Sequence, residues 1–161
     1  MTSPVGIRDR PGVVPRVTRD DLVAILVLGV LYYAAARLGL RLAIVEDNIT
    51  PLWPPTGLAL VAFLRYGRRL WPGVAIAAFL INLPITNFPA AVLTAAGNTL
   101  APMVSAWLLE RAGFRQQIDR VRDVVALVGL GALLSMTISA TIGSAALVLS
   151  SRIALDGFWG A

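Results

Sequence analysis

Residues 22–45 read LVAILVLGVLYYAAARLGLRLAIV, and Arg37 and Arg41 are the only charged side chains in this run. A helix rises about 1.5 Å per residue, so residues 21–45 reach about 37 Å and exceed the roughly 30 Å hydrocarbon core of a bilayer. The run is too long for the core of a signal peptide, and no small-residue cleavage site stands out near its end. It therefore predicts a permanent transmembrane helix, and this helix decides the fold class.

The chain as a whole has the composition of a membrane protein. Hydrophobic residues make up 57% of its 161 residues and charged residues 14%, whereas about a quarter of a soluble domain is charged. The 14 positive charges are all arginine, and they gather in clusters beside the apolar segments instead of along one basic face. This arrangement argues against nucleic acid as a partner and favours the lipid bilayer.

The absence of two residue types excludes several classes of chemistry. The chain contains no Cys, so it has no disulfide, no thiolate metal site and no covalent haem attachment. It also contains no His, which is the commonest metal ligand and the usual acid–base shuttle. No nucleophile–base pair can be assembled from the residues that remain. We therefore expect no enzymatic activity, no catalytic residues, no metal and no cofactor.

Further apolar segments follow the first one. Two adjacent prolines, Pro54 and Pro55, cannot lie inside a helix but suit its first turn, so a second helix is expected to begin there and to end at Gly67. This helix and a third one over residues 70–83 are too short to cross a bilayer alone, and they predict a hairpin with its tip at Arg65–Arg69. The remaining expected helices cover residues 90–111 and 121–149. The sequence thus predicts an all-α integral membrane protein with about five transmembrane helices, including this short-helix hairpin.

The distribution of arginine predicts the orientation. Residues 1–20 are rich in Pro and Gly and lack an apolar period, so they are expected to form a disordered cytoplasmic tail, with Thr18 or Asp20 capping the first helix. Four arginines lie in this tail, three in the hairpin tip and four in residues 111–122, which leaves three elsewhere. The positive-inside rule therefore places the N-terminus in the cytoplasm and the C-terminus outside.

Four small residues at four-residue spacing lie in the last apolar segment. Gly131, Ser135, Ser139 and Gly143 share one face of a helix. Small residues let a neighbouring backbone approach closely in lipid, so we interpret this small-residue stripe first as a packing seam within the chain. The alternative is a surface for a homodimer or for sliding during signalling.

An amide side chain lies near the middle of the fourth segment. Asn98 precedes Pro102 by four residues, and Pro102 lacks the amide that would have bonded the Asn98 carbonyl group. A polar side chain beside a free carbonyl at bilayer depth needs a partner. Either a neighbouring helix or a ligand is expected to supply it.

Arg37 and Arg41 lie on one face of the first helix, near its outer end. The default interpretation is snorkelling to the outer head groups, or pairing with Glu46 or Asp47. Alternatively, they form an electropositive vestibule with the N-terminus of the short second helix, where Trp53 and the double proline shape a cavity wall. The candidate ligand-binding residues are therefore Arg37, Arg41, Trp53, Pro54, Pro55, Gly57 and Asn98.

Several short motifs together resemble the bacterial membrane-associated sensor domain, type one. The similarity covers roughly residues 22–160, and the order and spacing of the motifs are more specific than any one of them. The motifs are Trp53-Pro54-Pro55-Thr56-Gly57-Leu58-Ala59-Leu60, Gly67-Arg68-Arg69-Leu70-Trp71-Pro72-Gly73, Ala36-Arg37-Leu38-Gly39, Gly97-Asn98-Thr99-Leu100, Trp107-Leu108-Leu109-Glu110-Arg111, Arg120-Val121-Arg122-Asp123-Val124 and Ser139-Ala140-Thr141-Ile142-Gly143.

The resemblance implies a multi-pass sensory input domain in the inner (plasma) membrane of a bacterium. Such domains usually precede cytoplasmic histidine kinase or cyclic-di-GMP output domains in the same chain. Residues 21–161 are expected to be the front half of the domain, because the family continues into further helices. A ligand pocket is expected to open outward between the hairpin and the first and fourth helices.

Two other classes of protein remain as alternatives. A transporter-like substrate-binding subunit would use the same short helices and Asn98, but the acidic residues all flank helix ends, which argues against ion coupling. An inert assembly subunit would show no ligand response that depends on Asn98 or Arg37.

Overall fold

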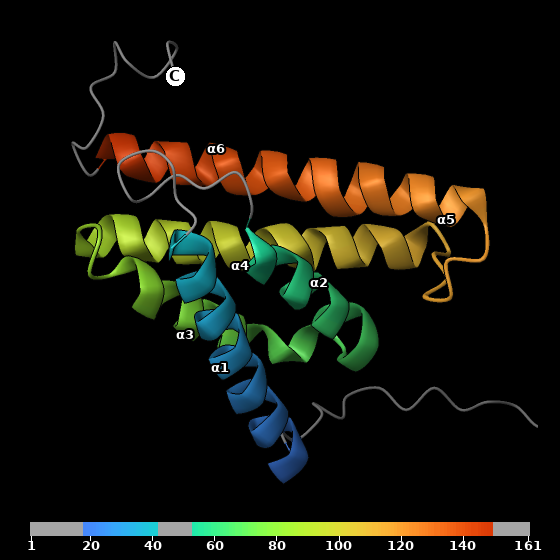
Figure 1. Ribbon diagram of the computed structural model, residues 1–161, viewed down its shortest axis with the longest axis horizontal. Helices are drawn as coiled ribbons and strands as arrows, with labels where there is room; N and C mark the ends of the chain where they lie inside the picture. Colours follow the sequence, from blue (N-terminus) through green and yellow to red (C-terminus); the bar gives the residue numbers. More distant parts are fainter. Residues whose placement is uncertain (1–17, 42–52, 150–161) are drawn as a thin grey trace, which may run out of the picture.

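The computed structural model describes residues 18–41 and 53–149, and all its regular elements over these residues are helical. The all-α membrane fold is therefore confirmed. The elements are α1 (Arg19–Arg41), α2 (Pro54–Tyr66), the 3₁₀ turn η1 (Arg68–Leu70), α3 (Trp71–Asn82), α4 (Phe88–Arg111), α5 (Val121–Ala126), the π-helical segment η2 (Leu127–Leu133) and α6 (Leu134–Leu149) (Figure 1).

The described helices differ in whether they are long enough to cross a bilayer. Three of them are long and apolar enough, namely Arg19–Arg41, Phe88–Arg111 and Val121–Ala146. The helices α2 and α3 have 13 and 12 residues, so each reaches only about 20 Å. They are joined by the expected turn at η1, but they diverge from it and pack on α1 and α4 and hardly on each other, so the expected hairpin is an open V (Figure 1). The predicted tail before Thr18, the predicted continuation of the first helix to Val45, and residues 150–161 lie outside the described residues.

Side chains cap the first and fourth helices. The hydroxyl group of Thr18 accepts a hydrogen bond from the Asp21 amide at 3.2 Å, and the Asp21 carboxylate accepts one from the Thr18 amide at 3.0 Å. This reciprocal pair is a capping box, so Thr18 and not Asp20 caps α1, which begins at Arg19. The Asn87 side chain accepts a hydrogen bond from the Ala90 amide at 3.0 Å. Helix α4 therefore begins at Phe88, two residues earlier than expected.

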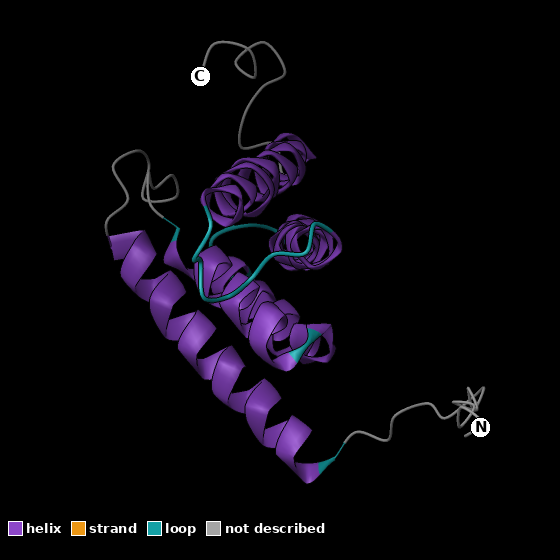
Figure 2. Ribbon diagram, turned by 90° about the vertical axis from the view of Figure 1, so that its right-hand side faces the viewer, coloured by secondary structure: helices purple, strands orange, loops and turns teal. Residues whose placement is uncertain are grey.

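The elements α5, η2 and α6 follow one another without a break, and we call them together the last helix. It lies side by side with α4 and runs in the opposite direction (Figures 1 and 2). Small residues permit this close packing, because a Cβ atom added to Gly97 of α4 would come within 2.8 Å of the Ile142 side chain.

Helix α1 runs obliquely to α4 and the last helix and packs across α3 (Figure 1). The two helices touch through glycine. A Cβ atom on Gly73 would collide with the backbone carbonyl oxygen of Ile25, and one on Gly29 would lie 3.2 Å from the Gly73 carbonyl oxygen. Because the obstructing atoms belong to the backbone, they cannot move aside as a side chain would.

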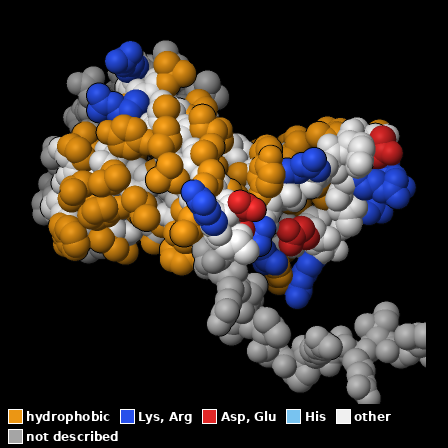
Figure 3. Space-filling view, turned by 90° about the horizontal axis from the view of Figure 1, so that it is seen from below, with side chains coloured by type: hydrophobic (Ala, Val, Ile, Leu, Met, Phe, Trp, Pro, Cys, Tyr) orange, Lys and Arg blue, Asp and Glu red, His pale blue; other side chains and the backbone are white. Residues whose placement is uncertain are grey.

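Much of the apolar surface remains exposed in this fold. Val30, Val61, Val125 and Leu133 each expose more than half of their surface, and on the face in Figure 3 hydrophobic side chains form broad areas between small groups of charged ones. A soluble monomer rarely exposes so large an apolar area. The surface therefore fits a hydrocarbon surrounding.

Polar contacts join the helix ends that carry the arginine clusters, which we call the inner end. Arg69 at the hairpin tip pairs with Asp21 of α1 at 3.1 Å, and Arg68 pairs with Glu110 of α4 at 3.4 Å. The Gln116 side chain donates a hydrogen bond to the Leu64 carbonyl oxygen at 2.8 Å, so the loop before the last helix is bound to the end of α2.

The α1–α3 crossing generates a prediction. Replacing Gly73 by Ala should destabilise the purified protein by about 1 to 3 kcal/mol, because the added methyl group meets fixed backbone atoms. The matched control is Gly143→Ala, since a Cβ atom there has no neighbour within 4 Å and Ala is the better helix former. Thermal unfolding in detergent measures both changes. A Gly73→Ala protein as stable as the control would contradict the close contact.

Candidate functional site

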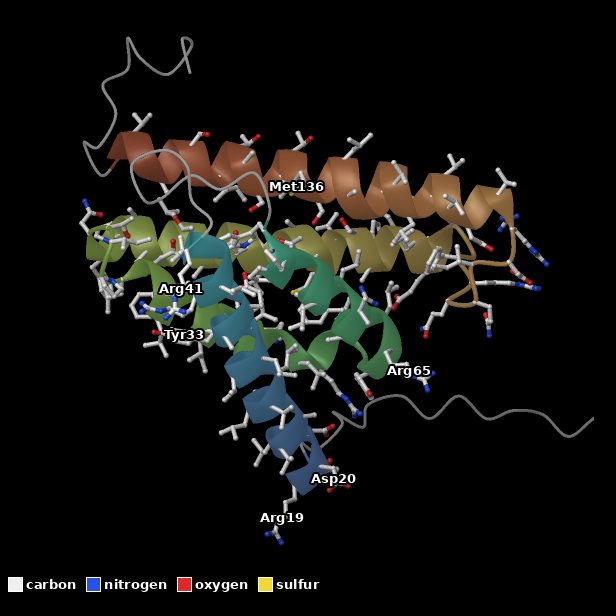
Figure 4. The ribbon with its side chains drawn as sticks, viewed as in Figure 1. Arg19, Asp20, Tyr33, Arg41, Arg65 and Met136 are labelled. Carbon is white, nitrogen blue, oxygen red and sulfur yellow. The ribbon has the colours of Figure 1, made fainter. Side chains whose placement is uncertain are left out.

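A hollow of about 270 Å³ lies between α2 and the last helix. Figure 4 shows Met136 on the last helix, and this residue and the first turn of α2 both border the hollow. None of the lining side chains is charged. The lining residues are Trp53, Thr56, Gly57 and Leu60 from the α2 side, and Leu127, Gly131, Ala132 and Met136 from the last helix.

The position of this hollow differs from the expected pocket. The sequence favoured a pocket between the hairpin and the first and fourth helices, but the hollow is bordered by the last helix. Trp53 and Gly57 are candidate residues that line it, whereas Arg37 and Arg41 do not. Both arginines are exposed on α1, and their suggested partners Glu46 and Asp47 lie outside the described residues.

The start of α2 is suited to lie inside a membrane. Arg65 marks the other end of α2, close to the inner end of the molecule (Figure 4), so the start of α2 lies up to about 20 Å from that end. Free amide groups would be unfavourable if this point lies in hydrocarbon. Pro54 and Pro55 have no amide hydrogen, and the Thr56 amide bonds to the Trp53 carbonyl oxygen at 3.4 Å. The first turn of α2 therefore offers fewer free amide donors than the start of an anion-binding helix usually does.

Several buried polar side chains lie at or near the hollow without a hydrogen-bond partner among the described residues. Thr56 lines the hollow and is 7% exposed, and its hydroxyl oxygen has no partner. The Ser135 hydroxyl is also buried and unpartnered. Leu60 packs against Gly131. Thr56 lies one turn before Leu60 on α2, and Ser135 lies one turn after Gly131 on the last helix. Since Leu60 and Gly131 are in contact, the two hydroxyl groups lie at a similar level on the two helices.

Tyr32 and Trp53 connect the hollow to α1. Tyr32 is fully buried, and the Trp53 indole is a polar neighbour of its hydroxyl group. Within the described part of the chain, neither the Tyr32 hydroxyl nor the Trp53 N–H forms a hydrogen bond of ordinary geometry. Sequence reasoning missed Tyr32. The adjacent residue Tyr33 is exposed, and two neighbouring tyrosines gave no signal of which one faces the core.

The wall opposite α2 is partly a π-helix. Residues Leu127–Leu133 form i→i+5 hydrogen bonds within an otherwise α-helical segment, and Leu127, Gly131 and Ala132 of this segment line the hollow. Short π segments are rare and often occur at functional sites. The sequence predicted a regular helix here. Gly129 and Gly131 were the available signal, because glycine weakens the α-helix around it.

The small-residue stripe packs within the chain. Gly131 and Ser135 are buried, and the Ser139 hydroxyl donates a hydrogen bond to the Asn98 side-chain oxygen of α4 at 2.8 Å. These contacts favour the packing seam over a dimer surface. They also give Asn98 a protein partner, although it is not a lining residue of the hollow. Gly143 differs from the other three, because a Cβ atom there would touch nothing.

Comparison with known proteins gives two matches. The profile of the MASE1 family matches residues 23–161. A segment of 62 residues is 34% identical to a probable diguanylate cyclase of Escherichia coli, DgcE, and covers 38% of this chain but only 6% of that protein. The chain therefore spans a small part of the length of this relative. No solved structure matches the chain.

The hydrogen bond between Asn98 and Ser139 generates a prediction. Interhelical hydrogen bonds in membrane proteins contribute about 0.6 to 2 kcal/mol. A double-mutant cycle with Asn98→Ala and Ser139→Ala should give a coupling energy in this range when unfolding is measured in detergent. Thr137→Ala is the control partner, because the Thr137 hydroxyl bonds to the Leu133 carbonyl oxygen of its own helix. Additive effects of Asn98→Ala and Ser139→Ala would show that the two side chains do not interact.

Proposed function

Because the chain belongs to the MASE1 family of membrane sensor domains, we propose that it perceives a small ligand within the bacterial inner membrane and relays the signal to a cytoplasmic output domain. The hollow between α2 and the last helix is the proposed ligand site. The observation that carries this proposal is that both walls of the hollow continue directly to the inner end of the molecule.

The first wall, α2, is connected to the loop before the last helix. The Leu64 carbonyl oxygen near the end of α2 accepts the hydrogen bond from Gln116 of this loop. The second wall reaches the same loop, because Asp123 in the first turn of the last helix accepts a hydrogen bond from the Arg115 amide at 3.3 Å. A shift between the two walls would therefore move the loop at residues 112–120.

The π segment supplies the two states that a sensor requires. Conversion of the π segment to an α-helix removes the extra residue of its wide turn. The part of the last helix before the segment then rotates relative to the part after it. A ligand that binds one arrangement more tightly than the other shifts the population toward it. Occupancy of the hollow thus changes the register of the last helix and, through Asp123, the inner loop.

The relative named above motivates the choice of output. A probable diguanylate cyclase carries a segment similar to this chain, so we propose that the output domain makes cyclic-di-GMP. The histidine kinase that the family resemblance implies is the alternative output. A transporter-like function has less support. Among the described residues, the acidic side chains lie at helix ends or in the loop between α4 and the last helix, where they cannot couple ion movement across the bilayer.

A chimera tests the proposed function. The chain is joined to a cytoplasmic diguanylate cyclase domain, and cyclic-di-GMP is measured in cells. Met136→Trp, which fills the hollow, should change the output at least twofold, because it holds the walls in one arrangement. The control is Leu133→Trp, which adds the same ring on the same helix but on an exposed side chain that does not line the hollow.

The outcomes of this test are distinct. If Met136→Trp alters the output and Leu133→Trp does not, the hollow controls the signal. If both variants insert into the membrane and neither changes the output, the hollow is not the sensory site. An equal change with both variants would also contradict the proposal, because the effect would not depend on the hollow.

The proposed orientation gives a separate prediction. The chain has no native Cys, so an introduced one is unique. A membrane-impermeant maleimide added to intact spheroplasts should label Pro84→Cys, in the turn before α4, and should label Gln117→Cys only after permeabilisation. Labelling of Gln117→Cys in intact spheroplasts would contradict a cytoplasmic N-terminus.

A further inference from the structure

We infer that the inner end of α4 binds the head group of an anionic phospholipid through Arg111, which is stacked on Trp107. This surface is separate from the hollow, because the hollow is lined by α2 and the last helix. The inference therefore does not depend on whether the hollow senses a ligand.

One exposed side of α4 changes in character along the helix. Residues four or seven positions apart share a helix face, and on this side Leu93 and Leu100 expose 37% and 48% of their surface. The same side continues toward the inner end through Trp107, which is partly buried, to Arg111, which is exposed. Tryptophan is common at the level where hydrocarbon meets the head groups. This side therefore offers apolar surface to an acyl chain and a cation to the head group above it.

The Arg111 guanidinium group is held in place and is not neutralised by an acid. Its central carbon lies 4.1 Å from the centroid of the Trp107 ring, which is a cation–π contact. The neighbouring acid, Glu110, pairs with Arg68 at 3.4 Å, and Arg111 forms no ion pair within the described part of the chain. Stacking on the ring leaves the N–H groups at the edge of the guanidinium available for two oxygens of one phosphate.

The negative end of the helix dipole would disfavour an anion at the end of α4. Arg122 offsets this effect, because its guanidinium group donates hydrogen bonds to the carbonyl oxygens of Ala112 at 2.9 Å and Gly113 at 3.5 Å. A second cation is thus fixed at the residues that directly follow Arg111.

The charge balance of the inner end favours an anionic lipid. Residues 19–21, 65–69 and 110–123 together carry eight arginines and five acidic side chains. A zwitterionic lipid would bring its own ammonium group into this positive field, whereas an anionic one would not. A free phosphate would use the arginine alone and leave the apolar side of α4 unused.

Competition between two phospholipids tests this inference. The full chain is purified in detergent and mixed with equal amounts of dioleoylphosphatidylglycerol, which is anionic, and dioleoylphosphatidylcholine, which is zwitterionic. Native mass spectrometry then measures how much of each lipid is bound. Both lipids have the same acyl chains, so only the head group distinguishes them. We expect bound phosphatidylglycerol to exceed bound phosphatidylcholine about tenfold, as hydrogen bonds to a charged group predict.

Variants assign this preference to Arg111. Arg111→Gln removes the charge and should reduce the preference to about twofold or less. The control is Arg65→Gln, because Arg65 is also an exposed arginine near the inner end without an ion pair among the described residues. It should keep the preference. Arg111→Lys retains the charge but not the planar stacked group, so it should lower the preference at least twofold, and it serves as the test if Arg111→Gln does not fold.

Each outcome decides the inference. Equal binding of the two lipids, or a preference that survives both Arg111 variants, would overturn it. An equal loss in Arg65→Gln would show a diffuse attraction to the whole inner end and would also overturn the assignment to Arg111. sn-Glycerol 1-phosphate has the phosphate of the head group without acyl chains. If it binds as well as phosphatidylglycerol, the site takes free anions and the lipid assignment is wrong.

Discussion

The need to satisfy backbone polar groups inside hydrocarbon determines how this molecule can be built. We propose that helix α2 begins within the bilayer, where each unpaired amide would be strongly unfavourable. The two prolines at Pro54 and Pro55 remove two of these amides, and the Thr56 amide is bonded to Trp53. A short helix can therefore start at this depth, and its start forms one wall of the hollow.

The other constraint is close helix packing without a hydrophobic driving force between helices. Glycine allows this close packing at two crossings. Gly29 and Gly73 let α1 approach α3, and Gly97 lets α4 approach the last helix. At the inner end, ion pairs and the hydrogen bond from Gln116 join the same helices. Both walls of the hollow, α2 and the last helix, continue to these inner contacts, so we propose that a change in the walls is transmitted to the loop at residues 112–120.

Much of this fold followed from the sequence, because apolar length and proline position are local properties. They predicted the first helix, the two short helices joined by a turn, and the start of α2 to within one residue. The orientation that the arginine clusters indicate stays a prediction. The position of the hollow did not follow, because it depends on a register between Leu60 and Gly131 that local patterns do not encode. The π segment and the burial of Tyr32 were missed for the same reason: neighbouring helices decide them.

We propose that Trp53 and the start of α2 lie deep in the hydrocarbon. It is tested most directly by the depth of Trp53 in a variant in which the other three tryptophans are replaced by Phe. Fluorescence quenching is measured in bilayers of lipids brominated either near the end or near the start of the acyl chain. We expect stronger quenching by bromine near the chain end, and stronger quenching by bromine next to the head group would contradict a deep position of Trp53.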